Sequence, residues 1–255
     1  MSLDTSAVER AARDLDRARS ILFVTGAGIS ADSGLPTYRG VAGLYDRGDT
    51  PDGMPIEEAL SGEMMRARPE IVWRYVREVE RACRGARPNR AHEVIAALER
   101  GPRRVWVLTQ NVDGLHLAAG SRNVIEIHGT VARMGCMDCT RIWPAPSYDE
   151  LPDLPRCACG GVARPDVVLF GETLPDAAIE ALHRELAVGF DAVVVVGTTA
   201  VFPYVQAPVL AAARAGLPTV EINPGETLLS DLVRHRVEER AAPALDALGR
   251  ALGVP

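Results

Sequence analysis

Short runs of apolar, β-branched residues recur along the chain and alternate with longer stretches of helical period. The runs are continuous in hydrophobicity, which is typical of strands covered on both faces. They lie at residues 21–25, 105–109, 124–128, 166–170, 192–196 and 219–223, and the helical stretches lie at 91–100, 175–188, 203–215 and 242–252. This alternation predicts parallel strand pairing with right-handed crossovers. We therefore expect an α/β fold with a Rossmann-like, doubly wound parallel sheet.

Two segments interrupt the alternation. Residues 40–89 contain loops rich in glycine and proline followed by an amphipathic helical stretch at 70–83, and residues 131–164 are rich in cysteine, proline and glycine. We expect a helical module and a metal-binding module that together form a smaller domain. The Rossmann-like domain would comprise 1–39, 90–130 and 165–255. Ligands of open α/β sheets bind beyond the carboxyl ends of the strands, so the insertions would cover a binding crevice.

Composition narrows the class of protein. Of the 255 residues, 47% are hydrophobic and 24% charged, which excludes disorder as the main state. The net charge of −6 gives no basic surplus for direct nucleic-acid binding. No apolar run approaches the roughly 18 residues that span a bilayer, and the N-terminus lacks an apolar signal core. We expect a cytoplasmic protein that does not contact the membrane, with a monomer as the default state.

Four of the five cysteines cluster in the second insertion. Cys136 and Cys139 form a C-x2-C pair, and Cys157 and Cys159 form a C-x-C pair after 17 intervening residues. Four thiolates suit tetrahedral Zn²⁺ and leave no open position for a substrate, so we predict one structural zinc ion. The C-x-C half is one residue shorter than a paired knuckle, and reduced cysteines without metal are the alternative. Cys83 is predicted to be a buried apolar residue.

The first strand is followed by Gly26, Ala27 and Gly28 in a G-x-G-x-x-A pattern that we expect to lead into a helix. Glycine permits a tight turn and close approach of the backbone to a pyrophosphate, and a helix N-terminus would add N–H donors. A tight turn without a ligand is the alternative. No acidic residue follows about 20 positions later, where a ribose partner of a dehydrogenase would lie. The pattern supports a dinucleotide but not hydride transfer.

Polar side chains follow the next strands. Gln110, Asn111 and Asp113 come after the second, and they indicate either a polar pocket or an Asx-capped turn. His128 ends the third, and its ordinary pKa of about 6.5 suits a general base. Asn223 ends another strand, where binding of a ribose hydroxyl and capping of a turn explain it equally well. His92, His116, His183 and His235 are assigned structural or surface roles.

Together, these segments resemble the sirtuins, which are NAD-dependent protein lysine deacylases. The resemblance runs from about residue 21 to residue 223 and rests on GAGISADSG, YRG, TQNVDGLH, HGT, the four cysteines, RPDVVLFGE, GTT and EIN, in that order. It implies NAD as a consumed co-substrate and acetylated lysine-containing proteins as partners. The acetyl group would pass to ADP-ribose with release of nicotinamide.

The resemblance also implies roles for individual residues. The catalytic residues would be His128, as the base, and Asn111. The cofactor-binding residues would be Gly26, Ala27, Gly28, Ser30, Tyr38, Arg39, Gln110, Asn111, Asp113, Gly197, Thr198, Thr199 and Asn223. The substrate-binding residues would be Val112, Val168, Phe170, Gly171, Glu172 and Val201, with Val112 and Phe170 in an apolar tunnel for the acyl-lysine stem.

Three departures from the family pattern bear on function. The usual P-D-F-R loop is P-T-Y-R at 36–39, and the usual G-T-S is G-T-T at 197–199. Members that remove acidic acyl groups carry Tyr and Arg three residues apart, whereas Val76 and Val79 occupy the matching positions here. The resemblance therefore favours acetyl or another neutral acyl group. Alternatives are a mono-ADP-ribosyltransferase, a deacylase for other acyl groups, a non-enzymatic NAD-binding module and a plain dehydrogenase.

Overall fold

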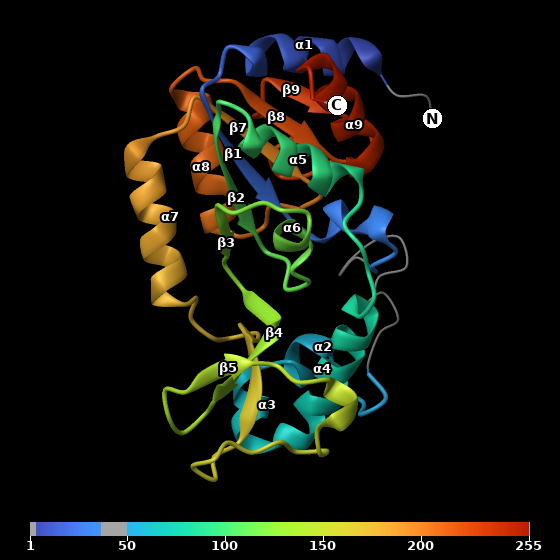
Figure 1. The fold of residues 1–255 in the computed structure, drawn as a ribbon, viewed down its shortest axis with the longest axis vertical. Helices are drawn as coiled ribbons and strands as arrows, with labels where there is room; N and C mark the ends of the chain where they lie inside the picture. Colours follow the sequence, from blue (N-terminus) through green and yellow to red (C-terminus); the bar gives the residue numbers. More distant parts are fainter. Residues whose placement is uncertain (1–3, 37–49, 255) are drawn as a thin grey trace.

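The computed structural model of the chain describes residues 4–36 and 50–254. A large sheet with its helices occupies one end of the molecule, and a small sheet with the helices of residues 56–83 occupies the other (Figure 1). The helices are α1 Thr5–Asp16, α2 Ile56–Ala59, α3 Gly62–Ala67, α4 Pro69–Cys83, α5 Arg90–Arg100, α6 Leu115–Ala118, α7 Asp176–Val188, α8 Pro203–Arg214 and α9 Ala241–Ala251. No described helix is both long enough and apolar enough to cross a membrane.

The large sheet has six parallel strands in the order β3-β2-β1-β7-β8-β9. Its strands are β1 Ser20–Thr25, β2 Arg104–Thr109, β3 Val124–Glu126, β7 Ala192–Val196, β8 Thr219–Ile222 and β9 His235–Val237. This is the order of a dinucleotide-binding Rossmann sheet, and the strand order reverses between β1 and β7. The predicted fold class is confirmed.

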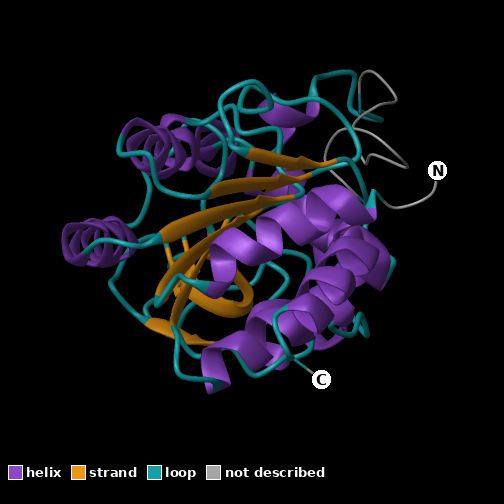
Figure 2. Cartoon of the chain, turned by 90° about the horizontal axis from the view of Figure 1, so that it is seen from above, coloured by secondary structure: helices purple, strands orange, loops and turns teal. Residues whose placement is uncertain are grey.

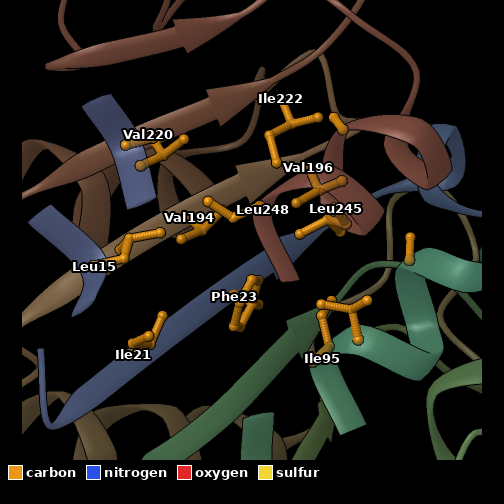
Figure 3. Packing of buried hydrophobic residues seen from close by; sticks show 14 of the residues in the cluster. Leu15, Ile21, Phe23, Ile95, Val194, Val196, Val220, Ile222, Leu245 and Leu248 are labelled. Carbon is orange, nitrogen blue, oxygen red and sulfur yellow. The ribbon is translucent and has the colours of Figure 1, made fainter. Parts of the chain in front are cut away.

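Helices on both faces of this sheet explain why its strands are apolar without alternation (Figure 2). Ile21 and Phe23 of β1 pack into one core with α1, α5 and α9, as Figure 3 shows. Leu22 and Val24 point to the other face, where α7 and α8 cover them. Successive side chains of a strand point to opposite faces, so both sets are buried.

The small sheet is antiparallel, in the order β5-β4-β6, with strands β4 Gly129–Cys136, β5 Ile142–Pro144 and β6 Ala163–Val167. Its core is shared with α2, α3 and α4. Trp73 of α4 is 1% exposed, and its indole N–H donates to the carbonyl oxygen of Ala163 over 3.0 Å. The two insertions in the sequence therefore pack against each other.

The predicted strand at 166–170 is wrong in its bounds and in its sheet. The strand here is β6, which ends at Val167 and pairs with β4 in the small sheet. Hydrophobicity alone does not select a pairing partner, and Pro165, which lacks an N–H donor, fits this edge strand better than a central one. The strand predicted at 124–128 is shorter, since β3 ends at Glu126 and His128 lies in the turn to β4.

The helix expected directly after β1 is also wrong. Two 3₁₀ turns, Ala27–Ile29 and Ala31–Ser33, follow the strand instead. Gly34 ends the second turn with a φ of 84°, in the left-handed region, and Pro36 comes two residues later. A left-handed glycine followed by proline stops a helix, so the chain turns away before an α-helix can form.

Candidate active site

The loops after β1 and β7 meet backbone to backbone at the point where the strand order reverses. Gly26 N–H donates to Val196 O over 3.1 Å, and Gly28 N–H donates to Gly197 O over 2.8 Å. A Cβ atom on Gly28 would lie 2.6 Å from the Gly197 Cα, and one on Gly26 would lie 2.7 Å from the Thr198 Cβ. The glycines are therefore required by the packing of the two loops, which leaves Ala27, Gly28 and Gly197 partly buried at the carboxyl end of the sheet, where Rossmann-like folds bind a dinucleotide.

Asn111, Ser30 and Asp113 form a chain of hydrogen bonds beside these loops. The Asn111 side-chain amide donates to Gly26 O and to Ser30 Oγ, each over 3.1 Å, and the Ser30 hydroxyl donates to Asp113 Oδ2 over 2.7 Å. Burial raises the pKa of Asp113, while hydrogen bonds from the Leu115 backbone and from Ser30 oppose that shift. The loops after β1 and β2 thus hold a partly buried carboxylate and an oriented, buried amide next to each other.

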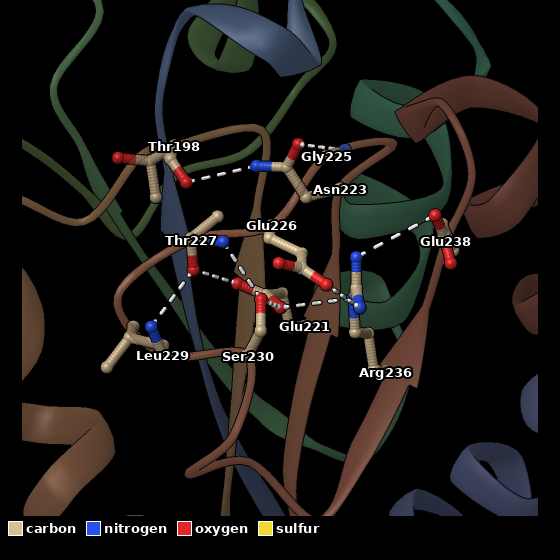
Figure 4. A network of polar contacts seen from close by, with 10 residues as sticks. All are labelled: Thr198, Glu221, Asn223, Gly225, Glu226, Thr227, Leu229, Ser230, Arg236 and Glu238. Carbon is tan, nitrogen blue, oxygen red and sulfur yellow. Dashed lines mark hydrogen bonds and ion pairs between the residues drawn. The ribbon is translucent and has the colours of Figure 1, made fainter.

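Gln110, Thr198 and Asn223 connect the loops after β2, β7 and β8. The Gln110 amide donates to Thr198 Oγ1 over 3.0 Å, and the Asn223 amide donates to Thr198 O over 3.0 Å. Asn223 Oδ1 also accepts from Gly225 N–H over 3.2 Å, so this residue caps a turn, which is one of the two roles left open by the sequence (Figure 4). Thr199 lies beside them with an exposed side chain.

A buried carboxylate holds the loop that follows Asn223. Glu221 of β8 is fully buried, and it accepts hydrogen bonds from Thr227 Oγ1 and, over 2.6 Å, from Ser230 Oγ (Figure 4). Arg236 of β9 lies 3.9 Å from the same carboxylate. The loop after β8 is thereby fastened to the sheet, which keeps Asn223 in place at the carboxyl end.

His128 reaches this cluster from the turn between β3 and β4. Its Nδ1 lies 2.9 Å from Gln110 O, and its own carbonyl oxygen accepts from Val168 N–H over 2.9 Å. Burial lowers the pKa of His128, and the bond to Gln110 O partly opposes that shift. The imidazole is therefore neutral at neutral pH and able to accept a proton, as a general base must be.

Tyr204, at the start of α8, is a residue that the sequence reasoning missed. Its hydroxyl lies 2.5 Å from His128 Nε2, and its ring stacks on Phe202 with centroids 5.4 Å apart. Phe202 also meets the His128 ring edge to face at 6.0 Å. No local motif marks an aromatic residue at this position, and only the position of α8 relative to the β3–β4 turn brings the two rings together.

The predicted substrate residues after β6 lie along one strip. Phe170 N–H donates to Leu60 O over 3.0 Å and Gly62 N–H donates to Phe170 O over 2.9 Å, so this strip is tied to the α2–α3 connection. Glu172 pairs with Arg164, with a shortest distance of 2.6 Å. The Phe170 side chain is 38% exposed, and Val201, from the loop after β7, is 49% exposed.

Two concave features border this strip. A groove of about 420 Å³ lies over the small sheet, where residues of β4 and β5, among them Cys136, face β6 and the residues after it, among them Val168 and Glu172. A second pocket is apolar and too tight to hold a water molecule, and Trp73 and Val76 line it. Its one charged lining residue in the described part is Arg164, whose charge is already paired with Glu172. Val79 is not part of this lining.

The four clustered cysteines converge as predicted. Their Sγ atoms all lie within 4.8 Å of one another, with Cys136 and Cys159 at 3.5 Å and Cys139 and Cys157 at 3.8 Å. A tetrahedral zinc site with Zn–S bonds of about 2.3 Å has S–S edges of about 3.8 Å. The shorter C-x-C half therefore does not prevent a fit to Zn²⁺.

Other predicted residues fall in three groups. His92 and His116 are buried in the core, where burial lowers the pKa of His92 to about 4 and also lowers the pKa of His116 well below its usual value. Cys83 is partly buried, with its thiol pKa raised to about 12 by burial. Tyr38 and Arg39 lie outside the described residues.

Comparisons with known proteins agree on one family. A profile of the Sir2 family matches residues 26–203. The NAD-dependent protein deacylase 2 of Pseudomonas aeruginosa is 52% identical over 242 residues, which cover 92% of this chain and 93% of that protein. The NAD-dependent protein deacylase 1 of Archaeoglobus fulgidus is 37% identical over 95% of this chain and 96% of that protein.

Solved structures give the same result. A Sir2 homologue in complex with NAD superposes with a TM-score of 0.87 at 35% identity, covering 96% of this chain and 93% of that one. A Sir2 protein with a deacetylated p53 peptide and 3'-O-acetyl ADP-ribose superposes with a TM-score of 0.85 at 29% identity, covering 97% of this chain and 99% of that one.

Proposed function

The chain belongs to the Sir2 family and is an NAD-dependent protein deacetylase, and we propose that His128 is the general base of its reaction. The single observation that carries this assignment is the contact of His128 Nδ1 with the Gln110 carbonyl oxygen. That oxygen lies 2.9 Å away and can only accept a hydrogen bond, so Nδ1 carries the proton. Nε2 therefore keeps its lone pair, which removal of a hydroxyl proton requires, and Tyr204 Oη lies 2.5 Å from it.

NAD, when bound, supplies the ribose carbon to which the acetyl oxygen is transferred as nicotinamide leaves. The chain contributes an oriented set of polar groups around that event. Asn111 and Asp113 are held through Ser30, so their geometry is set before substrates arrive, which lowers the reorganisation cost. We assign nicotinamide-ribose binding to them, and the adenosine half to the Thr198–Asn223 side of the crevice.

We assign acetylated lysine-containing proteins as substrates and place their backbone along the edge of β6. In the part of the chain that the structure describes, β6 is an edge strand paired with β4, so an extended peptide can add to its other edge as a further strand. Val168 and Gly171 would lie on one side of that peptide and Val201 on the other.

We propose a preference for acetyl or another neutral acyl group, because Val76 and Val79 stand where the resemblance matches the Tyr and Arg of members that remove acidic acyl groups. A succinyl group carries a carboxylate, which needs an unpaired cation once it leaves water. Valine offers no such cation, and the nearby Arg164 is already paired with Glu172. A short neutral acyl group meets no such penalty.

We also propose that residues 1–39, 90–130 and 165–255 form the NAD-binding domain and that 40–89 and 131–164 form the small domain, with β6 shared through its pairing to β4.

We further propose a cytoplasmic location, which is consistent with the reduced state of the cysteines. All five cysteines are free, and clustered thiols stay available for a metal in a reducing compartment.

The test is nicotinamide release from NAD, with and without an acetyl-lysine peptide. The native chain is expected to release nicotinamide only with peptide, and His128→Ala is expected to lose about 10²- to 10⁴-fold in kcat. His183→Ala is the matched control, because His183 lies exposed on α7. Release without peptide would support transfer of ADP-ribose to another acceptor, and equal rates in His128→Ala would exclude the assigned base.

A further inference from the structure

The hydroxyl of Tyr204 occupies the reactive side of the His128 imidazole. The Tyr204 Oη atom lies 2.5 Å from His128 Nε2, and the two rings are nearly perpendicular, at 86°. This distance is at the short end of hydrogen bonds between side chains. The contact is therefore a direct hydrogen bond without an intervening water.

The direction of this hydrogen bond follows from the other side of the ring. His128 Nδ1 donates to Gln110 O, so in the neutral imidazole Nε2 has no proton and accepts. Burial raises the pKa of Tyr204 to about 12, so its hydroxyl keeps its proton at neutral pH and donates. Tyr204 therefore donates to the only lone pair that His128 offers in the plane of its ring.

A ribose hydroxyl that gives its proton to His128 must approach the same lone pair. One ring nitrogen has one lone pair, so the two hydroxyls compete for it. Stacking on Phe202, at 10° between the ring planes, holds the Tyr204 ring in the position where it competes. Phe202 itself belongs to the loop after β7, next to Val201, in the segment assigned to substrate binding.

We propose that Tyr204 caps Nε2 of His128 and is displaced by the ribose hydroxyl when NAD binds. The proposal rests on the assignment of His128 as general base and adds a residue that controls access to it. Displacement costs the Tyr204–His128 hydrogen bond, so the cap weakens binding of ligands that carry the second ribose. It also keeps the base occupied until a hydroxyl with better contacts replaces it.

The other titratable groups on the surrounding elements have partners of their own and do not hydrogen-bond to His128 Nε2. Asp113, after β2, accepts from Ser30 and the Leu115 backbone, and Glu126 of β3 and Asp166 of β6 face Arg133 at 3.8 and 2.9 Å. Within the described residues, Tyr204 is the side chain that hydrogen-bonds Nε2.

The experiment compares equilibrium binding of ADP-ribose and of ADP to the full chain and to Tyr204→Phe by calorimetry. Phenylalanine keeps the ring stacked on Phe202 and removes only the hydroxyl. ADP lacks the second ribose and does not reach His128, so it serves as a matched ligand. We expect Tyr204→Phe to bind ADP-ribose roughly two- to tenfold more tightly, the equivalent of one hydrogen bond, and to bind ADP with unchanged affinity.

Equal or weaker binding of ADP-ribose by Tyr204→Phe would contradict the proposal. Equal binding would mean that the Tyr204 hydroxyl does not compete with the ribose hydroxyl for His128 Nε2, and weaker binding would mean that the Tyr204 hydroxyl contributes to the bound complex. A parallel change in ADP affinity would also overturn the proposal, since this would indicate a general effect on the loop. Tyr148→Phe is the matched control variant, because the Tyr148 hydroxyl donates to Val131 O in the small sheet.

Failure of the assigned function has a different signature. In that case the native chain itself would show no peptide-dependent nicotinamide release, whatever the result for Tyr204. Should Tyr204→Phe not fold, 3-fluorotyrosine incorporated into the native sequence replaces it. A more acidic hydroxyl donates more strongly, so the cap predicts weaker binding of ADP-ribose and unchanged binding of ADP, and the opposite order would contradict it.

Discussion

Ser30 Oγ lies 2.7 Å from Asp113 Oδ2, and this hydrogen bond joins the loop after β1 to the loop after β2. The two residues are far apart in sequence and meet because β1 and β2 are parallel neighbours. Parallel strands bring their carboxyl ends to one edge, so side chains that follow them converge. This hydrogen bond stabilises the ionised form of the Asp113 carboxylate, which burial otherwise disfavours.

Ser30→Ala is therefore expected to change the pH dependence of NAD binding. Burial already raises the pKa of Asp113, and loss of the hydroxyl donor raises it further, because that donor favours the charged form. We expect the acid limb of NAD affinity to move upward by roughly one pH unit. Calorimetric titration at several pH values measures this, with Ser147→Ala, at an exposed site, as the control. If the acid limb of NAD affinity is the same in Ser30→Ala and in the native chain, Asp113 does not take part in NAD binding.

Buried histidines predict an acid-sensitive fold. The pKa of His92 falls from 6.5 to about 4 because the imidazole is buried. Between these values the unfolded chain binds a proton that the folded chain does not, so the free energy of unfolding decreases as pH falls, by up to about 1.4 kcal/mol per pH unit for this site.

Urea unfolding between pH 7 and pH 4 is the measurement. His92→Gln keeps a side-chain acceptor for the Asn89 N–H and removes the titration, so its stability is expected to vary less steeply with pH. His183→Gln changes an exposed histidine and is expected to keep the native slope. Equal slopes in all three proteins would refute the prediction.

The cysteine cluster predicts that zinc supports activity without taking part in the chemistry. β4 runs from Gly129, next to His128, to Cys136, so loss of the metal is transmitted to the base. We expect one zinc per chain by elemental analysis, and loss of zinc, thermal stability and deacetylase activity in Cys157→Ser. Cys83→Ser is the control, because Cys83 lies outside the cluster. Full activity in a zinc-free Cys157→Ser protein would contradict this.

Gly28→Ala tests whether the glycine pattern is needed for loop packing. The new methyl group would lie 2.6 Å from the Gly197 Cα and 2.9 Å from the Gly197 carbonyl oxygen, and backbone atoms cannot yield cheaply. We expect a loss of about 1–3 kcal/mol in the free energy of unfolding and weaker NAD binding. Gly225→Ala, where the added methyl group meets open space, is expected to be neutral. Chemical denaturation of both variants measures the two changes in the free energy of unfolding, and equal stability of Gly28→Ala and the native chain would contradict the prediction.

The chain contains no lysine, since all 28 basic residues other than histidine are arginine. It therefore offers no side-chain amine to acylating agents or to its own activity. Treatment with acetyl phosphate is expected to leave the deacetylase rate unchanged, whereas Arg10→Lys, at an exposed helical site, should gain one acetyl group by intact mass. Inactivation of the native chain by this reagent would show that another side chain is acylated.

Much of the architecture was predictable because it follows from local patterns. Continuous apolar runs indicated β1, β2, β7 and β8, and helical periodicity indicated α4, α5, α7, α8 and α9. Failures came where a local pattern has more than one solution. The hydrophobicity of the run at 166–170 did not select between the two sheets, and the residues after β1 formed 3₁₀ turns because Gly34 and Pro36 end the helical geometry.

In the candidate site, too, some features follow from local sequence and others depend on contacts between distant segments. The convergence of Gln110, Asn111, Asp113 and His128 at one edge of the sheet could be expected, because parallel strands bring their carboxyl ends together and buried polar groups need partners. Their hydrogen-bond partners could not be expected, since Ser30, Thr198 and Gly26 come from other strands. Tyr204 carried no signal, because its role depends on the position of α8 next to the β3–β4 turn.

The amino-acid sequence by itself determined the fold class, the cysteine cluster, the order of the polar strand ends and the family to which the chain belongs. Each of these depends on residue type and short-range spacing, which the chain carries wherever it folds. The tertiary structure alone decided the partner of β6, the contact of Gly28 with Gly197 and the hydrogen bond from Tyr204 to His128. These contacts join segments distant in sequence, and their geometry exists only once the sheet and its helices have packed.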